Sequence, residues 1–237
     1  MSILFAGDVH GNTSHLLWLF KQAKESKANA IVVAGDFGYW PHYESGQEFI
    51  ADTAAFSEDH NIDLYWVDGN HENHDKLNEL VEEHGNQHPI RISGRVYYIP
   101  RGCIVNIDDR NIMGFGGAVS VDRGWRTAGE TWWASEAITA DEVDALKCPT
   151  SSNAQVDILV THEAPAGPAL SYKDDPDPDP VFMESVAQRD LVKRIQDKVM
   201  PTVHICGHHH TRATWRSGAT TVHVLNRDTM RDSFIVI

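Results

Sequence analysis

The chain is short of cysteines and of basic residues, and each shortage excludes a class of protein. Its three cysteines, Cys103, Cys148 and Cys206, are scattered and odd in number, so they form neither a disulfide framework nor a C-x-x-C pair and indicate a reducing compartment. Lysine and arginine number 20 against 34 acidic residues. The net charge of −14 argues against a long nucleic acid as the main partner, because basic side chains provide most of that binding.

Long apolar runs are also missing from the sequence. No stretch approaches the roughly 18 residues that indicate a membrane-spanning helix. Residues 1–4 lead directly into a strand-like run, without the basic and apolar regions of a secretory signal. We therefore expect a cytoplasmic protein with no membrane contact. With 41% hydrophobic residues, no low-complexity tract and no internal repeat, the chain is expected to form a single domain over residues 1–237.

Strand-like and helical patterns alternate along the first third of the chain. This β-α-β order predicts a sheet with parallel strands and an α/β fold of two sheets with flanking helices. Beyond Pro89, the runs 95–99, 103–107 and 111–115 are separated by turn residues and predict an antiparallel meander. The other predicted strands are 3–7, 30–35, 62–67, 156–160, 203–207, 213–216, 220–225 and 233–237, and the predicted helices are 12–28, 46–59, 74–84, 139–147 and 183–198.

Five blocks rich in Asp, Asn and His follow strand-like runs. Such groups are costly to bury at strand ends unless something binds them. The two-residue spacing of Asp8 and His10 lets both side chains face one ion, and the Asp36 carboxylate has two oxygens with which to bridge two ions. Mixed His, Asp and Asn ligands suit manganese, iron, zinc or nickel rather than calcium. The blocks are 7–11 (GDVHG), 35–36 (GD), 69–72 (GNHE), 161–162 (TH) and 207–210 (GHHH).

In this order the five blocks resemble the motifs of the calcineurin-like metallophosphoesterase superfamily, including its small bacterial and phage members. The resemblance implies a sandwich of two mixed β-sheets with flanking helices and a hydrolase with a dinuclear metal site, manganese being the first expectation. It implies that Asp36 bridges the ions and that His71 protonates the leaving alkoxide. The implied ligands are Asp8, His10, Asp36 and His210 for one ion, and Asp36, Asn70, His162 and His208 for the other.

Two arginine positions of the superfamily's Ser/Thr protein phosphatases are missing. Those enzymes carry G-D-x-V-D-R-G and an Arg directly after G-N-H-E, whereas this chain has GDFGYW at 35–40 and Asn73 after Glu72. A site with fewer guanidinium groups binds a dianionic monoester more weakly than the protein phosphatase site does. We therefore favour a phosphodiesterase acting on small diesters such as cyclic nucleotides. The alternatives are a Ser/Thr protein phosphatase, a broad phosphomonoesterase, or a non-catalytic metal-binding scaffold.

The segment 114–126 is the expected region of substrate contact. Its glycines allow close backbone approach, Arg123 and Arg126 are predicted to bind phosphate, and Trp125 is one of three tryptophans available to stack on a base. His74 is a further predicted substrate contact. Structural roles are the alternative for each of these residues: surface ion pairs for the arginines and core packing for the tryptophans and His74. The acidic, proline-rich loop 174–180 is interpreted as either a lid that favours small substrates or a solvated loop.

Overall fold

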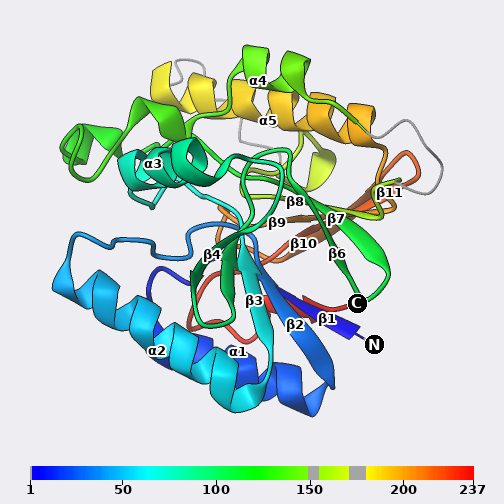
Figure 1. The fold of residues 1–237 in the computed structure, drawn as a ribbon. Coiled ribbons are helices and arrows are strands. Elements are labelled where there is room, and N and C mark those ends of the chain that lie inside the picture. Colours follow the sequence, from blue (N-terminus) through cyan, green and yellow to red (C-terminus); the bar gives the residue numbers. More distant parts are fainter. Residues whose placement is uncertain (1, 149–154, 171–179) are drawn as a thin grey trace.

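The computed structural model describes residues 2–148, 155–170 and 180–237 (Figure 1). Within them the strands form two six-stranded mixed sheets, ordered β12-β1-β2-β3-β5-β4 and β10-β11-β9-β8-β7-β6. The first sheet contains β1 (Ser2–Ala6), β2 (Ala28–Val33), β3 (Asp63–Trp66), β4 (Ile90–Ser93), β5 (Val96–Tyr98) and β12 (Phe234–Val236). The second contains β6 (Ile104–Ile107), β7 (Arg110–Phe115), β8 (Ile158–Thr161), β9 (Val203–Cys206), β10 (Ala213–Ser217) and β11 (Thr220–Val224).

Helices cover the outer face of each sheet, so the fold has four layers. In Figure 1, α1 (Thr13–Glu25) and α2 (Glu44–His60) lie below the first sheet, and α4 (Ala140–Ala145) and α5 (Pro180–Val199) lie above the second. The α3 helix (His74–His84) follows β3 and contacts β4. The predicted α/β sandwich with flanking helices is therefore confirmed.

Apolar cores between the layers hold the fold together. The alternation of apolar residues along β1 separates two of them: Leu4 faces the core under α1 and α2, whereas Ile3 and Phe5 face the core between the two sheets. The central core also receives Ile158 and Ile205 from the second sheet. The β1, β2 and β3 strands run parallel, so their carboxyl ends lie at one edge of the sheet, and the polar blocks 7–11, 35–36 and 69–72 follow them there.

Side chains cap the starts of three helices. The side chain of Asn12 accepts a hydrogen bond from the backbone of His15 at the start of α1. Thr139 and Glu142 form a reciprocal capping box at the start of α4. Asn73 caps α3 as Asn12 caps α1, with its side chain accepting a hydrogen bond from the backbone of Lys76. Because α3 starts at the first residue after this cap, the block 69–72 lies immediately before the N-terminus of a helix.

The predicted antiparallel meander over 95–115 is wrong. The β6 and β7 strands do form an antiparallel hairpin, but β5 belongs to the other sheet, where it pairs parallel with β3 and antiparallel with β4. The β4 strand was not predicted at all. Short apolar runs separated by turns carry no information about which sheet they join, because that choice depends on long-range packing.

The acidic loop 174–180 lies almost wholly outside the described residues, which resume at Pro180. Pro180 is the first residue of α5, a position that proline tolerates because the first N–H groups of a helix have no partner within it. Among the described helices, none combines the length and apolarity needed to cross a bilayer.

Candidate metal centre

The predicted ligands come together where strands of the two sheets end. Asp8, Asp36 and Asn70 follow β1, β2 and β3 of the first sheet, and His162 follows β8 of the second. His208 and His210 follow β9. A hydrogen bond of 2.8 Å between Nδ1 of His162 and the Ala34 carbonyl joins the ends of β8 and β2 directly. The face-to-face packing of the sheets thus gathers groups that are far apart in the sequence, such as Asp8 and His208, which are 200 residues apart.

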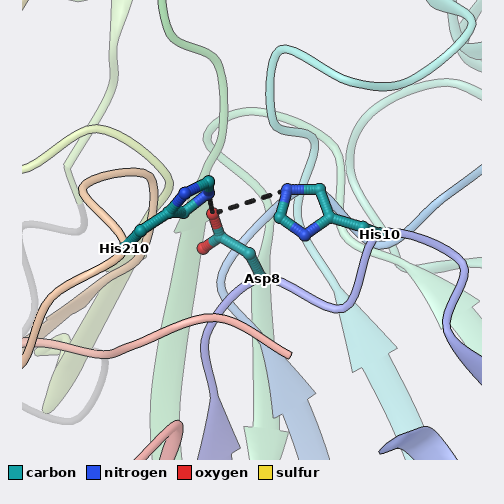
Figure 2. A group of neighbouring side chains, drawn as sticks. All are labelled: Asp8, His10 and His210. Atoms are coloured by element: carbon teal, nitrogen blue, oxygen red, sulfur yellow. Dashed lines mark ion pairs between the residues drawn. The ribbon is translucent and has the colours of Figure 1, made fainter. Parts of the chain in front are cut away.

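One set of side chains surrounds the carboxylate of Asp8. Its Oδ2 lies 3.0 Å from Nε2 of His210 and 4.0 Å from Nε2 of His10. Nε2 of His10 is also 3.4 Å from Oδ2 of Asp36. Figure 2 shows one Asp8 oxygen directed at both imidazole rings, which approach it from opposite sides. We call these residues the first sphere: Asp8, His10, Asp36 and His210.

A second set meets at the other oxygen of Asp36. Nε2 of His162 lies 3.3 Å from Oδ1 of Asp36 and 3.1 Å from Oδ1 of Asn70. The ring of His208 packs edge-on against that of His162, with 4.9 Å between centroids. We call Asp36, Asn70, His162 and His208 the second sphere. Asp36 belongs to both spheres, as the resemblance implies for a bridging ligand.

The buried carboxylates of Asp8 and Asp36 face imidazole rings and backbone N–H groups. Oδ2 of Asp8 is buried and forms no hydrogen bond, although the His210 ring is close. Burial raises the pKa of Asp36, but the nearby His162 and His71 imidazoles outweigh it and hold the pKa well below its usual value. An anionic pair of buried carboxylates facing imidazole nitrogens is a donor set that divalent transition-metal ions fit.

Four predicted ligands lie in the left-handed backbone region that residues other than glycine seldom adopt. The φ angles are 50° at His10, 48° at Asp36, 65° at His208 and 48° at His210. Each such conformation costs on the order of 1–3 kcal/mol and persists where the surrounding structure enforces it. The concentration of this strain at the predicted ligands supports a functional site here.

The glycines that precede ligands allow this close packing. A Cβ at Gly35 would overlap with Nδ1 of His162, and one at Gly69 would overlap with Oδ1 of Asp36. Real Cβ atoms do not approach other groups so closely. Any other residue at either position would displace a ligand of the second sphere.

His71 lies beside the spheres but does not belong to either. Its backbone N–H donates to Oδ1 of Asp36 at 2.8 Å, and its ring packs edge-on against that of His10 with 5.7 Å between centroids. Burial and the adjacent Arg126 lower the pKa of His71, while Asp36 opposes them. A histidine at this place can hold or release a proton within reach of a bound ester.

Arg126 reaches the site from a segment far away in the sequence. Its Nη2 lies 2.8 Å from Nδ1 of His71, and its Nη1 donates to the Asn70 carbonyl at 3.3 Å. Asp122 holds the guanidinium through a 2.9 Å ion pair. The structure therefore brings this predicted substrate contact to the predicted proton donor and supplies an arginine that the local motifs lack.

The other two predicted substrate contacts lie elsewhere. Arg123 forms an ion pair of 2.7 Å with Glu184 of α5 and lies over the Trp132 ring. His74 is buried, with Nε2 3.0 Å from the Gly69 carbonyl, and burial lowers its pKa to about 4. It lines a cavity of about 720 Å³ with residues of α3 and α4, and none of the predicted ligands lines that cavity. These contacts match the structural alternative for both residues.

Three supporting residues were not predicted from the sequence. Ser120 accepts a hydrogen bond of 3.1 Å from the Asn70 amide nitrogen, which leaves the amide oxygen facing the second sphere. Glu72 accepts from the backbone of Gly69 at 2.6 Å, and burial raises its pKa to about 8. Asp228 contacts His10. Glu72 stands inside a recognised motif and Ser120 inside the segment 114–126, so both could have been singled out, whereas Asp228 lies in a segment without any motif.

The sequence profile of the calcineurin-like phosphoesterase family matches residues 1–212, and the chain belongs to this family. No curated protein sequence matches it significantly. Among solved structures, the Thermus thermophilus protein TT1561 is similar with 15% identity and a TM-score of 0.60, over 95% of this chain and 89% of that one. A Staphylococcus aureus protein proposed to be a 5′-nucleotidase, solved with α-ketoglutarate, is similar with 12% identity and a TM-score of 0.50, over 99% of this chain and 50% of that one. At these identities the likeness is one of fold. Family and fold together define the protein as a metallophosphoesterase.

Proposed function

We propose that the protein is a dinuclear metal-dependent phosphodiesterase that hydrolyses small diesters, with cyclic nucleotides as the substrate class to test first. The observation that carries this proposal is the position of Asp36, whose two oxygens face the imidazoles of two different ligand sets. When bound, two divalent ions would supply Lewis acidity and lower the pKa of the attacking water. Manganese is the expected metal, with iron, zinc and nickel as alternatives.

The chain's own residues supply positioning and proton transfer. Asp8, Asp36 and the imidazoles hold their metal-facing atoms in a preformed cluster, so little reorganisation is needed during reaction. His71, which lies outside both spheres, donates a proton to the leaving alkoxide. Arg126 lies against His71, where it orients the ring and binds a phosphoryl oxygen of the substrate.

The preference for a diester rests on the number of guanidinium groups. A monoester dianion carries one more charge than a diester and gains more from paired arginines. Arg123 pairs with Glu184, so of the two arginines predicted to bind phosphate only Arg126 contacts the loop of Asn70 and His71. One arginine suits a monoanion.

A phosphomonoesterase is the second candidate, and the same contact favours it. The local motifs contain no arginine beside His71, yet Arg126 occupies that place in the folded chain. Arg126 thus provides part of the binding to a monoester dianion that the missing motif arginines would provide. The relative rates of the two ester classes decide between the candidates.

The test uses the full chain, stripped with chelator and reloaded with Mn²⁺. Turnover is measured on bis-p-nitrophenyl phosphate, p-nitrophenyl phosphate and 2′,3′- and 3′,5′-cyclic nucleotides. We expect metal-dependent hydrolysis with diesters turned over faster than the monoester. Faster monoester turnover would select the second candidate, and no metal-dependent turnover of any substrate would contradict the enzyme assignment.

A further inference from the structure

The segment between β11 and β12 crosses from the second sheet to the first, at the edge where the ligands meet. At its start, the Leu225 backbone donates to the Cys206 carbonyl of the second sheet. At its end, the Ser233 carbonyl accepts from Gly7 at the end of β1. The segment lies beyond residues 1–212, which match the family profile. No predicted ligand or catalytic residue lies in it.

Asp228, in the middle of this segment, touches the first sphere in two ways. Its backbone N–H donates to the Asp8 carbonyl at 2.7 Å. Its Oδ1 lies 3.3 Å from Nδ1 of His10. Its second oxygen accepts a 2.7 Å hydrogen bond from the side chain of Asn12, which also caps α1. The carboxylate is therefore held on one side by Asn12 and presents its other oxygen to the imidazole.

The contact bears on which nitrogen of His10 can bind a metal ion, because the two ring nitrogens have different roles in each tautomer. A histidine ligand binds through an unprotonated nitrogen, so the proton of the neutral ring must reside on the other one. Nε2 of His10 faces Asp36 and Asp8, and Nδ1 faces Asp228. An acceptor at Nδ1 keeps the proton there, orients the ring and leaves Nε2 free.

His10 needs such support more than His162 of the second sphere does. Its side chain is 23% exposed, whereas that of His162 is fully buried and has its Nδ1 fixed by the Ala34 carbonyl. A partly exposed ring keeps more rotamer freedom, which metal binding must remove. Asp228 provides for His10 what a backbone carbonyl provides for His162.

We propose that Asp228 is a positioning residue of the first sphere: its carboxylate holds His10 as the Nδ1–H tautomer with Nε2 directed at the ion. The inference rests on the proposed metal site and extends it to the C-terminal segment. Removing such an outer partner typically lowers metal affinity about 10- to 100-fold.

The matched variants are Asp228→Ala, Asp228→Asn and Asp232→Ala, each as the full chain. Asp232 lies in the same segment but bonds Asn226 and not His10, so it controls for effects on the segment itself. The backbone contact of residue 228 with Asp8 survives each substitution, which favours a retained fold. Circular dichroism and thermal unfolding verify folding.

The first measurement is calorimetric titration of each stripped variant with Mn²⁺. We expect Asp228→Ala to bind the ion of the first sphere about 10- to 100-fold less tightly. The affinity for the ion of the second sphere should not change. Asp228→Asn keeps an acceptor oxygen and is expected to lose less, and Asp232→Ala to match the wild type. If Asp228→Ala unfolds, Asp228→Leu takes its place, because leucine has a similar volume and no acceptor; wild-type affinity for both ions in a folded Asp228→Leu overturns the proposal.

The second measurement detects the tautomer itself and does not depend on activity. In the Zn²⁺-loaded protein, the Nδ1–H proton of His10 is expected to give a slowly exchanging NMR signal in the wild type and in Asp228→Asn. In Asp228→Ala that signal should be lost. A retained signal, or wild-type affinity for both ions, would overturn the role of Asp228 alone. If the wild-type chain binds no ion, the proposed function fails and this inference fails with it.

Discussion

The two candidate ligand spheres each contain two histidines and share Asp36, but they differ in their exposure to solvent. In the first sphere the side chains of His10 and His210 are 23% and 41% exposed. In the second sphere His162 is fully buried and His208 is 12% exposed. Asp36 therefore belongs both to a solvent-exposed sphere, the first, and to a buried sphere, the second.

The two spheres are held in place by different contacts. Buried ligands of the second sphere are fixed by their surroundings: His162 by the Ala34 carbonyl and Asn70 by Ser120. The first sphere faces solvent and depends on Asp228 and on strained backbone at His10 and His210. We therefore expect the first ion to exchange more readily and to lie nearer to the entering substrate.

The largest effect is expected from the residue that the two spheres share. Asp36→Ala removes a ligand from both, and turnover of bis-p-nitrophenyl phosphate should fall by about 1,000-fold or more, which corresponds to about 4 kcal/mol. Elemental analysis should show the loss of both ions. Asp59→Ala, on the exposed face of α2, is the control. If one ion remains and turnover is near normal, Asp36 does not bridge.

A residue outside both spheres should change the chemistry without changing the metal content. His71→Gln removes the proposed proton donor, and kcat on an alkyl diester is expected to fall about 100-fold. The loss should be smaller for p-nitrophenyl esters, whose leaving group needs no proton. Exposed His88→Gln serves as the control. An equal loss on both kinds of ester would show that His71 has another role.

Acid should weaken the buried scaffold behind the second sphere. His204 is buried between Thr161 and Gln196, and burial lowers its pKa from 6.5 to about 3. As the pH falls below about 6.5, the unfolded chain binds a proton that the folded chain excludes, so stability decreases. Between pH 7 and pH 5 this single group should cost about 2 kcal/mol.

Chelator-treated protein shows this effect without a contribution from metal release. The free energy of unfolding of wild type and His204→Gln is measured by urea denaturation at both pH values. The variant should lose about 2 kcal/mol less than the wild type, and exposed His84→Gln should behave as the wild type. Parallel losses in wild type and His204→Gln would show that His204 titrates normally.

The smallest effect is expected from the support of Asn70. Ser120→Ala removes the acceptor of the Asn70 amide hydrogen bond and allows the amide to rotate, so affinity for the second ion should fall about 10-fold. Asp228→Ala should affect the first ion instead. Mn²⁺ titration of the two variants and of their double mutant checks the separation, since independent sites give additive changes. Strong non-additivity would show that the spheres are coupled.

The sequence predicted much of the secondary structure because the signals for it are local. The α3 helix begins and ends at His74 and His84, as predicted, since its cap and its apolar spacing lie within the helix. The same local signals could not place β5, which joined the first sheet by pairing with β3. Pairing partners depend on packing between distant segments, and a run of three or four apolar residues does not specify them.

In the candidate site, too, local motifs could be predicted and long-range contacts could not. Motif reasoning named seven candidate ligands and His71, and all of them follow strands whose ends lie at one edge. The missing arginines in the local motifs were also interpreted as evidence about the substrate. In the folded chain, however, Arg126 contacts His71 although it lies 55 residues away in the sequence. Conversely, His74 looked like a substrate contact in the motif region but is buried behind it.

The types and spacing of the candidate ligands could be read from the sequence, because ligand motifs, glycine positions and helix caps are properties of short segments. The contacts that support these residues could be read only from the folded chain. Asp228 lies 218 residues from His10 and reaches it because the chain crosses between the two sheets at their common edge. Contacts of this kind arise from the packing of whole sheets, and no local pattern encodes them.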